Sequence, residues 1–375
     1  MKVIQEQQKP LSRLGFKISM YFFVLVILMG ILNAFKFWSV FGTAERGFLL
    51  AHVHMGTLGV LSMGIITFYL SEIGVEKHLL LTRIMGSALA VFIVAIVLKY
   101  LTGYAAILGI GAFIGYSAMA HVGVNILVYS YRNNSELRYV YTLNIGSLLF
   151  GILYGFIYSL RGIFSFSLTG DTLGAHAASI EVGFLIMASM IILDYVLGKN
   201  HSLWQASAFA LYSLLIGLGL FLDSQLLLRP AIIFFILGAL IAVARFVRLI
   251  DLGDTAGIHA GFSVLGVISY AIFLIAITVN FLSQDKVVPS HLFIGSSHLV
   301  FLVIVSNALF GYMYSKLGEV EELFKNSYKI FVWGFNIAAL LFVLFLLLDM
   351  GGHMATIMGP LLLIGVFDFL KSLNK

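Results

Sequence analysis

The chain has 375 residues, of which 61% are hydrophobic and 10% are charged, whereas a soluble domain has about 45–50% apolar and about 25% charged residues. This composition excludes a water-soluble globular fold and indicates a chain that folds in lipid, so we attribute the net charge of +5 to basic loops rather than to nucleic-acid binding. The absence of cysteine excludes disulfides, thioether-linked haem and cysteine-ligated iron–sulfur clusters.

Hydrophobic segments recur along the whole chain, and each is close to the ~20 residues that a membrane-spanning helix needs. The first follows four basic residues and is followed by aromatic rather than small residues, so we interpret it as a retained helix and not as a signal peptide. The predicted spans are 18–38, 48–70, 81–98, 105–129, 140–160, 172–197, 204–222, 230–246, 256–281, 290–314, 330–348 and 354–370. The longest loop, 315–329, is predicted to form a short surface helix. We therefore predict an all-α, polytopic integral membrane bundle of about 12 helices, forming a single transmembrane domain over residues 1–375.

Basic residues predict how this bundle is oriented. With twelve spans, 16 of the 22 Lys and Arg residues fall on the side that holds the N-terminus, and 6 fall on the opposite side. Lys and Arg accumulate in cytoplasmic loops, so both termini are predicted to be cytoplasmic. The expected location is the inner, cytoplasmic membrane of a cell, with membrane lipid as the main partner.

Histidines are concentrated at the ends of four predicted spans that open on the non-cytoplasmic side. They are His52 and His54 in the second span, His176 in the sixth, His291 and His298 in the tenth, and His353 in the twelfth. His54 and His298 are predicted to lie at similar depth, about 10 Å inside their helices. Two neutral imidazoles on different helices can bind a haem iron from both faces. The alternative is that each is a core or headgroup-level histidine bonded to a backbone carbonyl.

The second span also carries a stripe of small residues. His52, Gly56 and Gly59 share one helix face, which would let a flat porphyrin approach the backbone. The alternative interpretation is ordinary helix packing on small residues. His52 and His54 point in different directions; the stripe favours His52 as the iron ligand and depth favours His54, so the choice stays open. His176 is the best candidate for a second metal site, and His291 and His353 are secondary candidates.

Three further residues are candidates outside this set. His259 opens the ninth span on the predicted cytoplasmic side, where His121 is a possible neighbour, so a second metal site and two isolated core histidines are both open. Glu181 lies deep in the sixth span, either as part of a proton path or as a protonated carboxyl bonded to a neighbouring helix. His78 and His201 are expected to be solvated loop residues.

Several of these motifs resemble known haem proteins. The sequence His-Val-His-Met-Gly at 52–56 resembles the second helix of haem–copper oxidase main subunits and, more closely, NnrS-type haem- and copper-containing membrane proteins. His-Ala-Gly-Phe at 259–262 is similar to a motif of the latter family, and His121 and His298 fall where family histidines are expected. The resemblance implies twelve helices, b-type haem, copper as a further metal, and a quinone or cytochrome as electron partner.

The chain departs from the oxidases in ways that bear on its chemistry. The seventh span lacks their pair of adjacent histidines, and Ile180 stands where they carry a tyrosine. Two functions therefore remain. The first is a haem-binding, candidate copper-binding membrane protein with a redox or nitric-oxide-related role. The second is a secondary transporter with a histidine-lined substrate or proton path, which the similar Gly-Asp-Thr openings at 170–172 and 253–255 would fit as inverted repeats.

Overall fold

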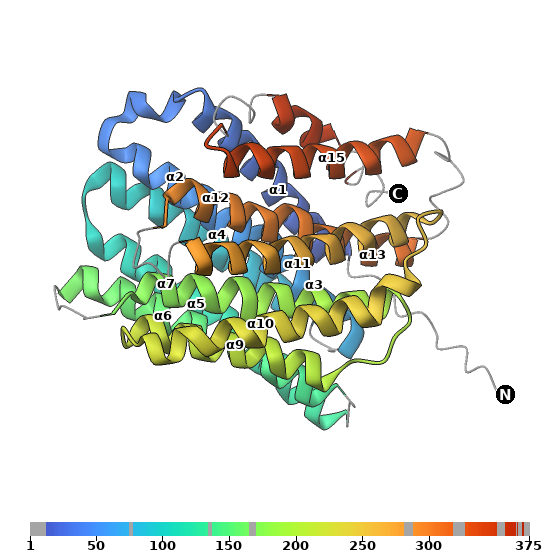
Figure 1. Cartoon of the computed structure of the whole chain (residues 1–375). Coiled ribbons are helices and arrows are strands. Elements are labelled where there is room, and N and C mark those ends of the chain that lie inside the picture. Colours follow the sequence, from blue (N-terminus) through green and yellow to red (C-terminus); the bar gives the residue numbers. More distant parts are fainter. Residues whose placement is uncertain are drawn as a thin grey trace.

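The computed structural model describes residues 13–74, 78–133, 137–164, 170–280, 288–317, 327–350, 357–364, 366 and 370, and these residues form helices and connecting turns without a strand. Ten helices are long and apolar enough to cross a membrane. They are Arg13–Ala34, Glu45–Ile73, His78–Thr102, Ala105–Arg132, Arg138–Leu160, Thr172–Val196, Leu203–Phe221, Gln225–Leu249, Thr255–Asn280 and Ser290–Lys316. Figure 1 shows them running side by side, so the prediction of an all-α, multi-pass membrane bundle is confirmed.

The last two predicted spans are described less fully. The eleventh corresponds to α15 (Ser327–Leu347), whose apolar part is Val332–Leu347. Of the twelfth, residues 357–364 are helical, and much of the remainder lies outside the described residues. The surface helix predicted at 315–329 also falls largely outside them, since 318–326 are not described.

The eighth predicted span begins earlier than expected. The sequence interpretation placed its start at Pro230, but α10 runs Gln225–Phe246 with Pro230 inside it. Pro230 lies in the second turn, where it removes one backbone hydrogen bond, and membrane-spanning helices tolerate such a loss. The helix therefore begins before the proline and includes the apolar residues 226–228.

The second, sixth and tenth spans share an irregularity that an α-helix pattern does not predict. Each begins as an α-helix, continues as a wider π-helix and returns to α. They are α2 (Glu45–His54), η2 (Met55–Ser62) and α3 (Met63–Ile73); α7 (Thr172–Ala178), η3 (Ser179–Ile186) and α8 (Met187–Val196); and α12 (Ser290–His298), η6 (Leu299–Val305) and α13 (Ser306–Leu317). The starts α2, α7 and α12 lie at one end of the bundle, on the left in Figure 1.

Each π segment is supported by a polar side chain from the preceding span. Ser19 of α1 (Arg13–Ala34) donates to the Val60 carbonyl at 2.6 Å. Asn144 of α6 (Arg138–Phe164) donates to the Phe184 carbonyl at 2.8 Å. Ser263 of α11 (Thr255–Asn280) donates to the Ile304 carbonyl at 2.8 Å. A π turn disturbs the regular backbone ladder, and lipid cannot satisfy a freed carbonyl, so a neighbouring helix must. The arrangement recurs every four spans.

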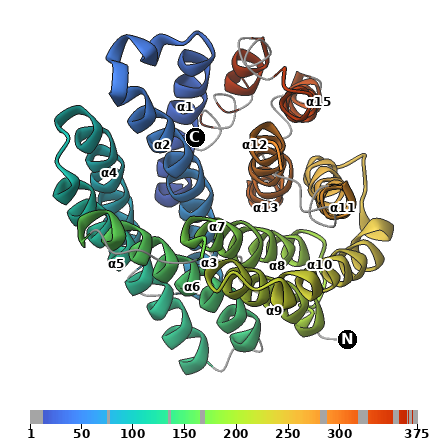
Figure 2. The same cartoon turned by 60° about the vertical axis from the view of Figure 1, so that its left-hand side comes forward.

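The helices not yet named are η1 (Phe37–Ala44), α4 (His78–Thr102), α5 (Ala105–Arg132), α9 (Leu203–Phe221) and η4 (Val247–Leu249). In Figure 2, α1 and α2 lie on one side and α12 and α15 on the other. The candidate site lies among these four helices and α7.

The orientation is open to a direct test with reporter fusions. A reporter fused after Ser130, at the end of α5, is expected to face the cytoplasm, and one fused after Leu160, near the end of α6, is expected to face the opposite side. The reason is the concentration of basic residues on the N-terminal side. Paired alkaline phosphatase and fluorescent-protein fusions measure this, and reports of the same side from both positions would contradict the assignment.

Candidate functional site

A cavity of about 400 Å³ lies at the non-cytoplasmic end predicted for the bundle. Its walls come from α1, α2 with η2, α7 with η3, α12 with η6, α15 and the helical residues 357–364. Four histidines line it: His52, His54, His176 and His298. Most other lining residues are apolar. A volume of this size matches cavities that bind a cofactor or a drug-sized ligand, which are typically ~300–1,000 Å³.

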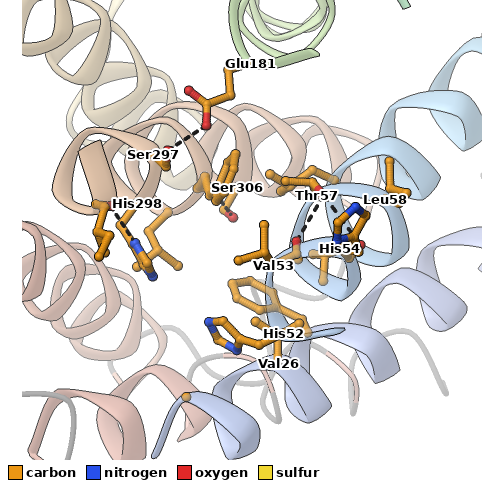
Figure 3. Close-up of a pocket in the computed structure, with 18 of the residues that line it drawn as sticks. Val26, His52, Val53, His54, Thr57, Leu58, Glu181, Ser297, His298 and Ser306 are labelled. Atoms are coloured by element: carbon orange, nitrogen blue, oxygen red, sulfur yellow. Dashed lines mark hydrogen bonds between the residues drawn. The ribbon is translucent and has the colours of Figure 1, made fainter. Parts of the chain in front are cut away.

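The His52 and His298 rings face each other across part of this cavity. Their centroids are 6.4 Å apart and their planes differ by 26°, and Figure 3 shows both rings beside the same open space. Two imidazoles on one metal have ring centres about 6 Å apart, because each metal–nitrogen bond is ~2 Å and each nitrogen lies ~1.1 Å from its ring centre. The separation of the two ring centres is therefore close to that of two imidazoles on opposite sides of one metal ion.

The hydrogen bonds of these two residues leave nitrogen atoms available to a ligand. His298 Nδ1 lies 2.8 Å from the Ile294 carbonyl, so it donates its proton there and Nε2 carries the lone pair. His52 Nδ1 is buried and makes no hydrogen bond with the described residues. A buried polar nitrogen without a partner is costly, and a bound group would offset that cost.

Glycines border the cavity next to the His52 ring. A Cβ on Gly30 of α1 would lie 3.2 Å from His52 Cε1, so a larger residue there would push the ring from its position by a few tenths of an ångström. Gly56 lines the cavity as the predicted stripe requires, whereas a Cβ on Gly59 would lie 2.7 Å from the Phe22 ring. The two interpretations of the stripe thus each apply to one residue: Gly56 borders the cavity and Gly59 serves helix packing.

His54 and His176 occupy another part of the same cavity. His54 Nδ1 lies 2.9 Å from the Leu50 carbonyl, and His176 Nδ1 lies 2.7 Å from the Gly151 carbonyl. Both therefore donate through Nδ1 and keep Nε2 as the acceptor nitrogen. The two side chains are close enough to interact electrostatically. His54 does not pair with His298, although equal depth predicted it.

The backbone beside these histidines is π-helical rather than α-helical. The segment η2 begins directly after His54, and η6 begins directly after His298. Their widened turns use hydroxyls as internal donors: Ser62 donates to the Thr57 carbonyl at 2.8 Å, and Ser306 to the Phe301 carbonyl at 2.7 Å. Such turns are frequent at functional sites because they rotate the flanking side chains relative to each other.

Glu181 reaches the cavity from η3. Its Oε1 accepts a hydrogen bond from Ser297 of α12 at 2.6 Å, as Figure 3 shows. The predicted contact with a neighbouring helix is therefore present, and the carboxyl group also lines the cavity. The hydrogen-bonded pair Glu181–Ser297 therefore lines the same cavity as His52 and His298.

The other predicted histidines lie apart from this cavity. His291 is half-buried on α12 and is not among the cavity-lining residues, and His353 lies outside the described residues. His121 is exposed on α5 beside Asn125, and His259 is buried with its Nδ1 2.6 Å from Asn307 Oδ1. His121 and His259 thus do not form a shared site. Within the part of the chain that is described, no group of three or more metal-ligating side chains occurs.

Two histidines were assigned to solvated loops, and the structure corrects both. His78 begins α4 and is half-buried. His201 has a side chain only 10% exposed and forms an ion pair with Asp194 at 2.9 Å. The cause is packing around the loop: Asp194 of α8 lies seven residues before His201, and α10 brings Arg245 to the same carboxylate from 51 residues away.

Gly155 of α6 provides a test of how closely the helices approach His176. A Cβ there would lie 2.6 Å from His176 Nδ1, so Gly155→Ala is expected to displace the ring and destabilise the bundle by about 1–3 kcal/mol. Gly146→Ala is the matched control, because a Cβ on Gly146 of the same helix meets nothing within 4 Å. Thermal unfolding in detergent measures both, and equal stabilities would contradict the packing around His176.

The sequence pointed to the histidines, but it did not reveal the residues that shape their cavity. Gly30 on α1, Phe342 on α15 and Gly359 near the C-terminus have no motif that marks them, and helix contact alone places them here. Comparison of the chain with known protein families, with curated proteins and with solved structures finds no match, so the haem-protein resemblance rests on its short motifs.

Proposed function

We propose that this chain is a haem-binding integral membrane protein in which His52 and His298 ligate one b-type haem iron from opposite faces. The observation that carries the proposal is the 6.4 Å separation of the two rings at the wall of a 400 Å³ apolar cavity. The absence of cysteine excludes covalent thioether attachment and favours the b-type group.

The residues around the rings fit such a cofactor. The Ile294 carbonyl holds His298 with Nε2 as the ligand atom, and second-shell bonds of this kind orient metal-bound histidines. His52 brings a buried nitrogen without a partner, and Gly30 and Gly56 leave room for a flat ring next to the backbone. When bound, the haem would supply one-electron redox chemistry or binding of a small gas.

The remaining groups in the cavity suggest what accompanies the haem. His54 and His176 offer two acceptor nitrogens, which are suitable ligands for copper as a second metal. The Glu181–Ser297 pair is a candidate site for holding or passing a proton. A redox or nitric-oxide-related role in the cytoplasmic membrane, with a quinone or a cytochrome as electron partner, follows as the functional proposal.

The test is the visible spectrum of protein purified in mild detergent from haem-replete cells. Six-coordinate low-spin iron is expected, with split visible bands on reduction and about one haem per chain by the pyridine haemochrome assay. Equilibration with added haem controls for incomplete loading. Protein that stays colourless after this treatment would contradict the proposal and favour the transporter, in which the histidines line a substrate or proton path.

A further inference from the structure

A second group of chemically active side chains lies where α3 and α13 end, away from the cavity. Four tyrosines from four helices gather there, and we call them the tyrosine cluster: Tyr69 of α3, Tyr141 of α6, Tyr195 of α8 and Tyr312 of α13. Tyr69, Tyr141 and Tyr312 are at most 1% exposed, and Tyr195 is half-buried. Neither the motifs nor the proposed function accounts for the cluster.

Aromatic contacts connect the members of the cluster. The Tyr69 and Tyr141 rings are 4.9 Å apart, and the hydroxyls of Tyr141 and Tyr195 are 3.4 Å apart. Phe68 bridges the others, because its ring centroid lies 5.0 Å from that of Tyr195 and 4.8 Å from that of Tyr312. Electronic coupling between neighbouring rings is therefore available throughout the cluster.

The hydrogen-bond partners distinguish one tyrosine from the rest. The Tyr312 hydroxyl donates to Glu72 Oε1 at 2.5 Å. The Lys316 ammonium lies 3.0 Å from the same oxygen. In contrast, Tyr69 donates to the side-chain amide oxygen of Asn144. Tyr312 therefore donates to a carboxyl group, whereas Tyr69 donates to a neutral amide.

This difference matters when a phenol loses an electron. The oxidised phenol is a strong acid, so a neutral radical forms readily only where a base can take the proton at once. A carboxylate can accept that proton, whereas an amide oxygen is a very weak base. The low-dielectric surroundings penalise any alternative that leaves a separated positive charge on the ring.

We propose that Tyr312 is a one-electron oxidation site whose base is Glu72. One electron passes from the Tyr312 ring to a strong one-electron oxidant, and the hydroxyl proton passes along the existing hydrogen bond to Glu72 Oε1. The products are a neutral tyrosyl radical, a protonated Glu72 and the reduced oxidant. Return of the electron reverses both transfers. The cluster thereby acts as a reversible sink for oxidising equivalents inside the bundle.

The position of the pair suits this use. Glu72 and Lys316 have side chains 11% and 21% exposed, so the base lies near the surface while the phenol ring is dry. A dry phenol protects its radical from water and solutes, and a base near the surface stays accessible to ions. The inference does not depend on haem, because the oxidant in the test is supplied from outside.

The experiment is photo-oxidation of the purified full chain in lipid nanodiscs, prepared without haem. Flash-generated tris(bipyridine)ruthenium(III) is the oxidant, and samples frozen after increasing delays are measured by electron paramagnetic resonance. A long-lived tyrosyl signal is expected, and its formation should slow in D₂O because the proton moves with the electron. A purely structural tyrosine would show neither property.

Substitutions identify the site. Tyr312→Phe is expected to lose the long-lived signal, and Glu72→Gln to lose most of it, because glutamine accepts a hydrogen bond but not a proton. Tyr69→Phe in the cluster and Tyr158→Phe, a 42% exposed tyrosine of α6, should retain it. Incorporation of 3-fluorotyrosine at position 312 should change the hyperfine pattern without removing the hydroxyl, which covers the case in which Tyr312→Phe misfolds.

Two results would overturn the proposal. The first is a long-lived signal of unchanged amplitude in correctly folded Tyr312→Phe. The second is an unchanged hyperfine pattern after fluorotyrosine incorporation at position 312. Because the samples contain no haem, either result leaves the proposed haem site untouched, and a colourless protein would not affect this test.

Discussion

His298→Ala is expected to abolish the six-coordinate low-spin spectrum of the haem-loaded protein. His298 supplies one of the two rings whose 6.4 Å spacing fits a single iron, and the methyl group of alanine cannot coordinate. His52→Ala should have the same effect from the opposite face. Reduced-minus-oxidised difference spectra measure the loss, and added imidazole should restore the spectrum of His298→Gly by filling the vacated space.

Two histidine controls make this prediction sharp. His54→Ala should keep the low-spin spectrum, because the His54 ring packs against Phe92 at 5.4 Å and is not paired with His298. His291→Ala, on the same helix as His298 but outside the cavity lining, should also keep it. A normal spectrum in His298→Ala would refute the pairing of the second and tenth spans. Loss of the low-spin spectrum in His54→Ala but not in His52→Ala would identify His54, and not His52, as the second iron ligand.

Arg245→Ala is expected to cause the largest loss of stability outside the cavity. Arg245 of α10 donates to Asp194 at 2.6 Å, to the side chain of Gln205 and to the carbonyl of Asn200, so it joins α8, α9 and their connecting loop. Asp194 is 2% exposed, and His201 is then its remaining ion-pair partner. Breaking a buried ion pair from one side typically costs about 3–5 kcal/mol.

The control for this substitution is Arg248→Ala. Arg248 lies three residues further along, is exposed, and makes none of these contacts, so its loss should have little effect. The double variant Arg245→Ala with Asp194→Asn should be more stable than Arg245→Ala alone, because the uncompensated carboxylate is removed. Thermal unfolding in nanodiscs compares the four proteins. Equal unfolding temperatures for Arg245→Ala and Arg248→Ala would contradict the role of this ion pair.

The tertiary structure decided which histidine belongs to which part of the cavity. Depth along an ideal helix favoured His54 as the partner of His298, and the glycine stripe favoured His52. The contact observed is between His52 and His298, since rotation of α2 about its axis, and not rise along it, determines which ring faces α12. The rotation of a helix depends on the residues that pack against it, such as Gly30 of α1 beside the His52 ring. A pattern within the helix's own sequence does not contain that information.

The π segments could not be predicted for a related reason. Leu299–Val305 is as apolar as any membrane helix and carries no breaking residue, and the glycines of the other two segments, such as Gly56 and Gly183, are common in membrane helices generally. A π turn is stable in lipid only where another group satisfies the freed carbonyl, and Ser19, Asn144 and Ser263 provide that group from other helices. The burial of His201 also depends on packing, because Arg245 of α10 contacts the Asp194 carboxylate that His201 pairs with.

What the sequence by itself determined is the membrane-spanning bundle, the approximate position of its helices, and three of the four spans predicted to bring histidines to one end. Hydropathy is a local property, because every ~20-residue apolar segment must satisfy its own backbone in lipid. The tertiary structure alone decided that His52 pairs with His298, that Glu181 bonds Ser297, and that Tyr312 donates to Glu72. These contacts join residues that are between 116 and 246 positions apart, and only helix packing brings such residues together.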